Sequence, residues 1–243
     1  MVSADELETI HQASLKVLSD TGLDLLHGDA QTMLATAGCQ VDGDRVRFDP
    51  EMVTEMVDAA PAEFTLHGTS PAHDLQIGGD WVAYSSVASA PNFVDRATGR
   101  RTGDRAAYQL LLKLCQMLNS IHTVGGYPVE PVDIHPSVRH LEATFDALTL
   151  MDKSFHVYSL GRQRNLDAIE MVRIARGISD DELDEQPSIT SIINASSPLR
   201  YDTPMLEGII QMARRNQPLI ITCLLYTSPS PRDATLSRMP SSA

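Results

Sequence analysis

Five aromatic and polar residues follow apolar stretches of the sequence and could bind a small ligand. They are Tyr127, Tyr158, Ser159, Asn194 and Ser196. A tyrosine ring can lie against a cation, and hydroxyl and amide groups can hydrogen-bond a ligand. Each also has a simpler interpretation: glycines before Tyr127 permit a turn, Tyr158 packs inside a sheet, and Asn194 caps a turn. Both interpretations stay open at this point.

Other residues resemble parts of a metal or charge cluster. Asp133, His135 and His140 lie close together in sequence, but we interpret the first two as a loop and helix cap and expect no metal site. Lys153 is expected at a turn or on the surface. None of these residues is therefore assigned a chemical role.

The elements that would position the five candidates alternate regularly after residue 119. Apolar strands are predicted at 121–125, 155–160, 188–194 and 219–222, and amphipathic helices at 138–151, 166–176 and 204–215. Strand–helix repeats of this kind favour a parallel sheet with right-handed crossovers. The expected fold class is α/β, a partial (β/α)8 TIM barrel of about four βα units, with a doubly wound sheet as the alternative. No GxGxxG supports dinucleotide binding.

The segment before residue 119 has a different pattern. Ser3 and Glu6 have capping-box spacing and begin a helix that Gly22 ends. A second helix is predicted at 29–37 and a hairpin at 41–49. A third helix starts at Pro50, with Val53, Met56 and Val57 as its buried face. Short strands are expected at 64–66, 75–77, 81–84 and 92–94, a turn at 98–101, and a helix from 102 or 104. We therefore expect a helical and β-rich layer over residues 1–118 and barrel units over 119–222.

Composition narrows the class of protein. The formal net charge of −13 argues against a nucleic-acid surface, which needs clustered Lys and Arg. The start of the chain is acidic and mixed, unlike a secretory signal, and no apolar run reaches the about 18 residues needed to cross a bilayer. Cys39 and Cys115 are expected to be buried thiols, and no CxxC motif is present. These features favour a cytoplasmic protein.

The last segment, 223–243, has a composition unlike the rest of the chain. It is rich in Ser and Pro and lacks sustained periodicity. Residues 223–233 (CLLYTSPSPRD) and 237–243 (SRMPSSA) match the translation of a common transposase sequencing adapter in two separate blocks. We therefore expect 223–243 to be a non-native tail, Cys223 to be no natural cysteine, and the natural sequence to be interrupted at about Thr222.

Several phrases in the sequence resemble the trimethylamine methyltransferase family, which includes the non-pyrrolysine glycine betaine methyltransferases. They are LSDTG at 18–22, AP at 60–61 before FTL at 64–66, VD at 94–95 before TG at 98–99 with Arg101, DK at 152–153, and SPLRY at 197–201. Their order over residues 1–222 makes the resemblance fairly specific.

The resemblance implies a (β/α)8 barrel that is preceded in the sequence by a helical and β-rich N-terminal layer. It also implies transfer of a methyl group from a quaternary or tertiary amine to the Co(I) of a separate corrinoid protein. The corrinoid (B12) is expected on that partner and no cofactor directly on this chain. Catalytic residues are expected beyond residue 222, so the chain alone should be inactive, and the five candidates are expected to bind the amine at the carboxyl ends of the strands. A homo-oligomer of the full-length protein is compatible with the resemblance. The alternatives are direct transfer to a folate and a non-catalytic small-molecule binding module.

Overall fold

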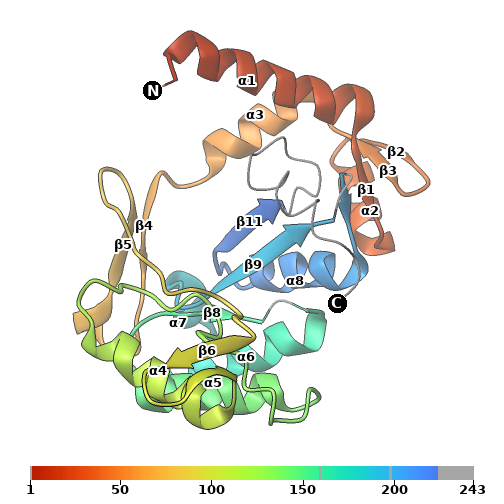
Figure 1. Cartoon of the computed structure of the whole chain (residues 1–243). Coiled ribbons are helices and arrows are strands. Elements are labelled where there is room, and N and C mark those ends of the chain that lie inside the picture. The colour runs from red at the N-terminus through yellow and green to blue at the C-terminus, as the bar shows by residue number, and fades with distance from the viewer. Residues whose placement is uncertain (1, 159, 197–198, 224–243) are drawn as a thin grey trace. The chain divides into compact units, whose positions relative to one another are not determined.

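The computed structural model describes residues 2–158, 160–196 and 199–223, and it divides into two compact units. The described residues of the first unit are 2–50, 194–196, 199–202 and 221–223. The described residues of the second unit are 51–158, 160–193 and 203–220. Figure 1 shows the course of the chain through both. The structure is a mixed α/β protein, as the sequence predicts at the level of class.

The first helix, α1 (Ala4–Lys16), forms where the capping residues place it. The Ser3 side chain accepts from the Glu6 amide, and the Glu6 carboxylate accepts from the Ser3 amide, so two otherwise unpaired donors are satisfied. A π-helical segment, η1 (Val17–Thr21), continues the helix and ends at Gly22 with φ 73°. A Cβ on Gly22 would lie 2.2 Å from the Val46 carbonyl oxygen, so this close approach requires glycine.

A four-stranded sheet completes the first unit, with the order β10-β1-β3-β2. Antiparallel β2 (Gln40–Asp42) and β3 (Arg45–Arg47) form the predicted hairpin, with Gly43 at φ 60° between them. Two strands were not predicted: β1 (Leu23–Leu25) and β10 (Arg200–Tyr201), which pair in parallel. Asp24 fixes them electrostatically, because its carboxylate pairs with Arg45 at 2.8 Å and Arg200 at 3.3 Å. The predicted second helix is α2 (Gly28–Thr36).

Helix α3 (Pro50–Ala59) begins at the predicted proline, but its predicted buried face is wrong. Met56 is 61% exposed and Val57 is 62% exposed, and α3 has no fully buried residue. Helical spacing places apolar side chains on one face, but it does not determine whether another element covers that face. In the described part of the chain, those two side chains remain open.

Two antiparallel hairpins follow, close to their predicted positions. The first joins β4 (Glu63–Leu66) and β5 (Leu75–Gly78) through the short 3-10 helix η2 (Pro71–His73). The second joins β6 (Asn92–Asp95) and β7 (Gly99–Thr102). Its turn lies slightly before the predicted 98–101, because Asp95 Oδ1 accepts from the amides of Ala97 and Thr98 and closes the chain there.

The predicted strand at 81–84 is wrong. Trp81 and Val82 are 72% and 68% exposed, and neither lies in a strand. The backbone contact begins only at the last residue of that segment, where the Tyr84 carbonyl oxygen accepts from the amides of His122 and Thr123, and Ser85 then forms a parallel bridge with Thr123. The Ser86 amide then donates to the Thr123 carbonyl oxygen at 3.3 Å. This segment therefore lies beside the first strand of the parallel array.

The parallel array runs in sequence order. Ser85 neighbours Thr123, Val124 neighbours Phe155, and a three-stranded sheet continues in the order β8 (His156–Val157), β9 (Thr190–Ala195), β11 (Leu219–Cys223). The predicted strand at 121–125 is thus reduced to two bridges and the one at 155–160 to two residues with a bridge before them. Each neighbour is the next segment along the chain, so the order contains no reversal.

Five helices alternate with these strands. They are α4 (Arg105–Met117), α5 (Arg139–Leu150), α6 (Arg162–Arg176), α7 (Asp180–Glu185) and α8 (Thr203–Arg214). Among the larger ones, α4 packs on α5, α5 on α6, and α6 on α8, so the helices follow the same order as the strands. The short α7 was not predicted, although Ser179 and Glu182 form a capping box that signals its start.

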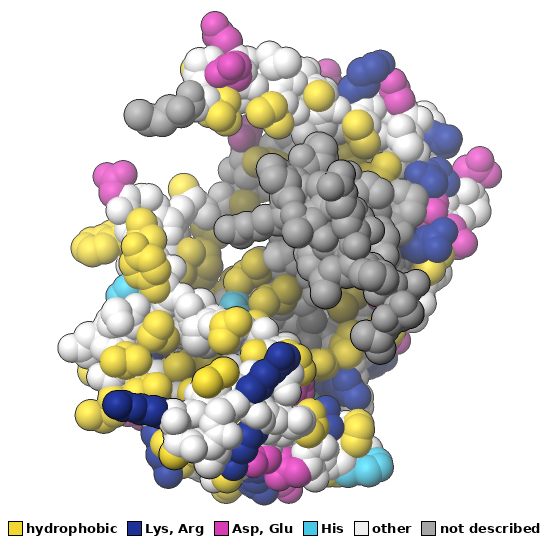
Figure 2. Space-filling view, in the orientation of Figure 1, with side chains coloured by type: hydrophobic (Ala, Val, Ile, Leu, Met, Phe, Trp, Pro, Cys, Tyr) yellow, Lys and Arg dark blue, Asp and Glu magenta, His cyan; other side chains and the backbone are white. Residues whose placement is uncertain are grey.

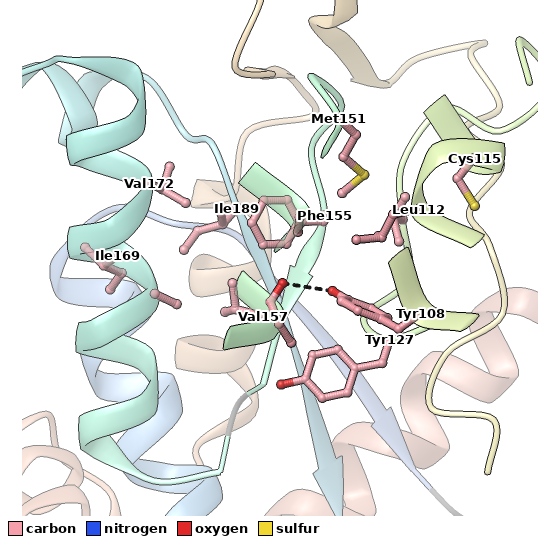
Figure 3. Close-up of a cluster of buried hydrophobic side chains, with 14 of the residues drawn as sticks. Tyr108, Leu112, Cys115, Tyr127, Met151, Phe155, Val157, Ile169, Val172 and Ile189 are labelled. Atoms are coloured by element: carbon pink, nitrogen blue, oxygen red, sulfur yellow. Dashed lines mark hydrogen bonds between the residues drawn. The ribbon is translucent and has the colours of Figure 1, made fainter. Parts of the chain in front are cut away.

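The core of the second unit lies between these helices and the sheet. Figure 3 shows Tyr108 and Leu112 from α4 facing Phe155 and Val157, with Ile169 of α6 beyond them. The Tyr108 hydroxyl donates to the Ala143 carbonyl oxygen at 3.0 Å, which pairs its buried polar atom. Cys39 and Cys115 are both buried free thiols, as predicted.

Lys153 is buried, which corrects the prediction of a turn or surface residue. It is only 5% exposed, and its Nζ donates to the carbonyl oxygens of Cys115, Leu118 and Ile121 at 2.7, 2.9 and 2.7 Å. Cys115 and Leu118 lie at the end of α4 and Ile121 lies before the bridge at Thr123, so their carbonyl oxygens have no helical donor. Burial lowers the pKa of the Lys153 amine. Lys153 therefore joins α4 to the sheet.

Apolar side chains are also exposed on the second unit. Figure 2 shows them gathered where β4, β5 and α4 lie, and Leu110, Leu114 and Met117 of α4 are 63%, 49% and 78% exposed. The face of α4 that is buried carries Ala107, Tyr108, Leu112 and Cys115 instead. Among the described residues, no helix combines the length and apolar character that a membrane crossing requires.

Candidate binding site at the carboxyl ends of the strands

Tyr127 and Tyr158 meet beyond the carboxyl ends of neighbouring strands. Their ring centroids are 5.1 Å apart with an interplanar angle of 24°, and Tyr127 also contacts Tyr108 edge-on at 5.6 Å. The glycines before Tyr127 have a structural reason. Gly126 has φ 78°, and a Cβ on Gly125 would lie 2.5 Å from the Ser86 carbonyl oxygen. The turn therefore needs glycine, and it delivers Tyr127 to the end of the strand.

The tyrosine pair is not an open aromatic surface. Tyr127 is only 5% exposed and belongs to the core. The guanidinium of Arg164 lies 5.7 Å from the ring centroid of Tyr158, in a cation–π position. The Arg164 guanidinium thus already occupies one position over the Tyr158 ring that a ligand cation could take.

Glu130 is a site residue that the sequence analysis missed. One carboxylate oxygen, Oε2, is buried without a hydrogen-bond partner among the described residues, and Arg139 Nη1 is 3.6 Å from it. Burial raises the pKa of Glu130, while Arg139 and the hydroxyls of Ser89 and Tyr158 act to lower it. Its signal in the sequence is a single acidic residue in an otherwise apolar loop, between Val129 and Pro131.

A cavity of about 180 Å³ adjoins the tyrosines. Arg139 and His140 from the start of α5, Arg164 from the start of α6, and the two tyrosines line it, and we call it the arginine pocket. His140 Nε2 lies 2.8 Å from Asp167 Oδ2, whereas its Nδ1 is buried and has no hydrogen-bond partner in the described structure. The two buried side-chain atoms without a partner in the described residues, on Glu130 and His140, thus both belong to residues around the tyrosine pair.

Asn194 and Ser196 lie in the first unit, at the end of β9 and just beyond it. The Thr222 hydroxyl donates to Asn194 Oδ1 across to β11, and Ser196 exchanges backbone hydrogen bonds with Arg200. The Asn194 contact joins two strands, so it does not test the turn-capping interpretation, and a ligand role for both residues stays a prediction. Ser159 lies outside the described residues.

Asp133, His135 and His140 do not converge. Asp133 Oδ1 accepts from the Arg105 amide at 2.8 Å, His135 Nδ1 lies 2.7 Å from the Ser137 hydroxyl, and His140 pairs with Asp167. Within the residues that the structure describes, no group of three or more His, Cys, Asp or Glu could hold a metal ion. Their contacts are those of a loop and a helix start, as the sequence analysis interprets them.

His156 is a second buried histidine, on β8. It is 7% exposed and hydrogen-bonded to the Thr190 hydroxyl on β9. Burial lowers its pKa to about 4, so the imidazole is neutral at pH 7. It therefore joins two strands and adds no charge.

A larger cavity, of about 710 Å³, lies at the other ends of the strands. Pro187 and Pro218, which line it, precede β9 and β11, and Phe64 and His67 come from the β4 region. Proteins with parallel α/β sheets, whether open or closed, bind their ligands at the carboxyl ends of the strands, so we place the candidate site at the tyrosine pair.

Comparison with known proteins decides the family. The model of the trimethylamine methyltransferase family (MTTB) matches residues 1–229, well over half of the chain. The chain belongs to this family. Its members are methyltransferases, so the resemblance seen in the sequence motifs is confirmed. The match extends past residue 222 and does not locate the boundary predicted there.

Relatives within the trimethylamine methyltransferase family differ in substrate. A glycine betaine methyltransferase of Desulfitobacterium hafniense is 32% identical over 240 residues, which is 98% of this chain and 50% of that protein. A trimethylamine methyltransferase from another strain of that species is 28% identical, over 89% of this chain and 44% of the relative. The proline betaine:corrinoid methyltransferase of Eubacterium limosum is 22% identical, over 95% and 49%. The chain therefore spans about half the length of the curated relatives it matches.

Proposed function

We propose that the chain is the N-terminal half of a methyltransferase that moves a methyl group from a quaternary or tertiary amine to a corrinoid protein. The family match over residues 1–229 carries this proposal. The names of the relatives supply the chemistry: two betaines and trimethylamine as substrates, and a corrinoid in one case. The whole protein would thus demethylate an amine of the betaine or trimethylamine type.

We propose that the parallel array is the first part of a (β/α)8 barrel. The strands neighbour one another in sequence order from Ser85 to β11, and the packed helices follow the same order. A doubly wound sheet would instead reverse its order at a switch point and carry helices on both faces. The structure supports counting the array from Ser85, earlier than the predicted start at residue 119, with α4 as its first crossover helix.

In this proposal the chain binds and orients the amine, and the corrinoid stays on the partner. A corrinoid in its Co(I) state supplies a strong nucleophile for a methyl group, so the protein's task is positioning. The residues at the carboxyl ends of the strands offer rings, hydroxyls and amides, which suit a small polar organic molecule. Tyr127, Tyr158, Ser159, Asn194 and Ser196 remain our candidates for binding it.

We further propose that residues 223–243 are the translated adapter and that the natural sequence continues differently after about Thr222. The two adapter-like blocks, 223–233 and 237–243, support this. The reacting groups would then lie in the half that the relatives have and this chain lacks. Reading the gene through codon 222 tests the idea: natural codons that run smoothly through Cys223 would contradict it.

The experiment for the function uses the complete reading frame. The purified full-length protein is mixed with a corrinoid protein reduced to Co(I) and with glycine betaine, proline betaine or trimethylamine. We expect the absorbance spectrum of methyl-Co(III) to appear with at least one amine. Methylation of a folate without any corrinoid protein would favour direct transfer. Saturable amine binding without transfer to either acceptor would favour a binding module.

A further inference from the structure

Two arginines and a histidine line the arginine pocket, and two of these three side chains already face a carboxylate. Glu130 lies 3.6 Å from Arg139 and Asp167 lies 2.8 Å from His140, whereas no carboxylate in the described part of the chain forms an ion pair or hydrogen bond with Arg164. The contact recorded for the Arg164 guanidinium is with the ring of Tyr158. A guanidinium at a cavity wall, with several N–H donors free, is suited to a planar anion such as a carboxylate.

Arg139 is held in place by other contacts. Its Nε and Nη2 donate to the Ile134 carbonyl oxygen at 3.2 and 2.9 Å. These bonds fix the guanidinium at the start of α5, next to the cavity. The side chain therefore keeps its position without a ligand and contributes positive charge to the pocket wall.

His140 adds an unpaired polar atom to the same wall. Its Nε2 lies 2.8 Å from Asp167 Oδ2, whereas its buried Nδ1 has no hydrogen-bond partner among the described residues. Because buried polar atoms in proteins are nearly always paired, the orphaned Nδ1 indicates that something polar belongs beside it.

The N-terminus of α6 is not the anion site. This N-terminus lies at a neighbouring cavity that Arg162 and Arg164 line. Glu207 already occupies the helix N-terminus, because the Arg162 amide donates to Glu207 Oε2 at 3.1 Å. A carboxylate of the chain thus fills the position that a helix N-terminus offers an anion. No Asp or Glu is among the residues that line the arginine pocket, although Glu130 and Asp167 face two of its lining side chains, and Arg164 is left without a carboxylate in the described structure.

We propose that the arginine pocket binds the carboxylate of a betaine, with Arg164 as its main counter-ion and Arg139 and His140 beside it. The choice of a betaine rests on the proposed function. The choice of a carboxylate rests on the pocket alone. In this arrangement the quaternary ammonium of the ligand points away from the arginines, and the carboxylate distinguishes a betaine from trimethylamine.

The experiment measures binding by the 243-residue chain, by saturation-transfer NMR and calorimetric titration. Glycine betaine carries both charges, choline has the same cation without the carboxylate, acetate has the carboxylate without the cation, and inorganic phosphate is a different anion. We expect betaine to bind, acetate to compete with it, and choline to bind at least about tenfold more weakly, the loss of one charged hydrogen-bonding partner.

The variant R164Q should weaken betaine binding about tenfold or more and leave choline unaffected. R162Q is the matched control, because Arg162 lies two residues away on the same helix turn, is exposed and does not line the pocket. H140Q provides a second variant. Circular dichroism establishes that each variant is folded.

Three results would overturn the proposal: no saturable binding of betaine or acetate, equal weakening by R164Q and R162Q, or displacement by phosphate but not by acetate. Failure of the methyltransferase proposal looks different. In that case the chain still binds betaine through Arg164, but the full-length protein transfers no methyl group.

Discussion

At the scale of single residues, local signals were predictable and long-range burial was not. Ser3 and Glu6 lie three residues apart, so their capping box follows from the sequence. The Lys153 ammonium group donates to the carbonyl oxygens of Cys115, Leu118 and Ile121, which lie more than thirty residues earlier in the sequence. A lysine just before a predicted strand is usually exposed. No spacing in the sequence indicates that three carbonyl oxygens lie within hydrogen-bonding distance of its ammonium group.

The first prediction concerns Lys153. Replacing it by methionine keeps the length of the side chain but removes the ammonium donor from all three carbonyl oxygens, of which only that of Leu118 keeps another donor, the Ile121 amide. Unpaired buried acceptors are destabilising, so K153M should lower the free energy of unfolding by about 2–4 kcal/mol. Urea denaturation followed by circular dichroism measures the change. K113M, on the exposed side of α4, is the control and should change stability by less than about 0.5 kcal/mol. Equal effects would show that the carbonyl contacts do not matter.

The second prediction concerns pH and His156. Its pKa falls from 6.5 to about 4 on folding, so between these values the unfolded chain binds more protons than the folded chain. Stability from this residue is present above about pH 6.5 and is lost as the pH falls toward 4, by about 3 kcal/mol in the limit.

Urea midpoints at pH 7 and pH 5 measure this loss. H156Q removes the titrating group but keeps a polar side chain for Thr190, so the variant should lose less stability between the two pH values than the unsubstituted chain. H11Q, at an exposed position on α1, should behave like the unsubstituted chain. An unchanged pH dependence in H156Q would contradict the buried, neutral state of His156.

At the scale of elements, the periodicity of the sequence predicted that helices and strands form better than it predicted which faces are buried and which strands pair. α3 begins at Pro50 as expected, yet its Met56 and Val57 are exposed. The pairing of β1 with β10 joins residues far apart in the chain, and short strands of two or three residues carry almost no periodic signal. The strand predicted at 81–84 was placed on apolar side chains, whereas the pairing with Thr123 is made through the backbone of residues 84–86.

The third prediction tests that pairing. The segment at Ser85 and Ser86 approaches Gly125 so closely that a Cβ there would lie 2.5 Å from the Ser86 carbonyl oxygen. G125A should therefore push the two segments apart and lower stability by about 1–3 kcal/mol, as overpacking does. Denaturation in urea measures the loss. G28A is the control, because no atom lies within 4 Å of a Cβ built on Gly28. A G125A variant as stable as G28A would argue against the first strand of the array.

The candidate site was predictable only in part. Tyr127 and Tyr158 were found from their positions after apolar runs, and the structure brings their rings together. Glu130, Arg139 and Arg164 were not found, because they come from a loop and from two helix starts and share no motif. Their common position follows from the strand order, which the sequence analysis left open between a barrel and a doubly wound sheet.

At the scale of the whole molecule, the repeat of strands and helices predicted the α/β class, and the neighbouring strands follow one another in sequence order, as the proposed barrel requires. The chain spans about half of its relatives, 50% of the glycine betaine enzyme. Half of a (β/α)8 barrel does not enclose a site. The fourth prediction is therefore that the 243-residue chain alone transfers no methyl group to a Co(I) corrinoid protein. Turnover by the purified chain would place the reacting groups within residues 1–243.

The central claim is methyl transfer from an amine to a corrinoid protein, and isotope labelling tests it most directly. The full-length protein is incubated with a Co(I) corrinoid protein and glycine betaine or trimethylamine whose N-methyl groups carry deuterium, and the corrinoid is analysed by mass spectrometry. The account predicts a cobalt-bound trideuteromethyl group that depends on the full-length protein. A corrinoid without the label for every amine of the betaine and trimethylamine type would contradict it.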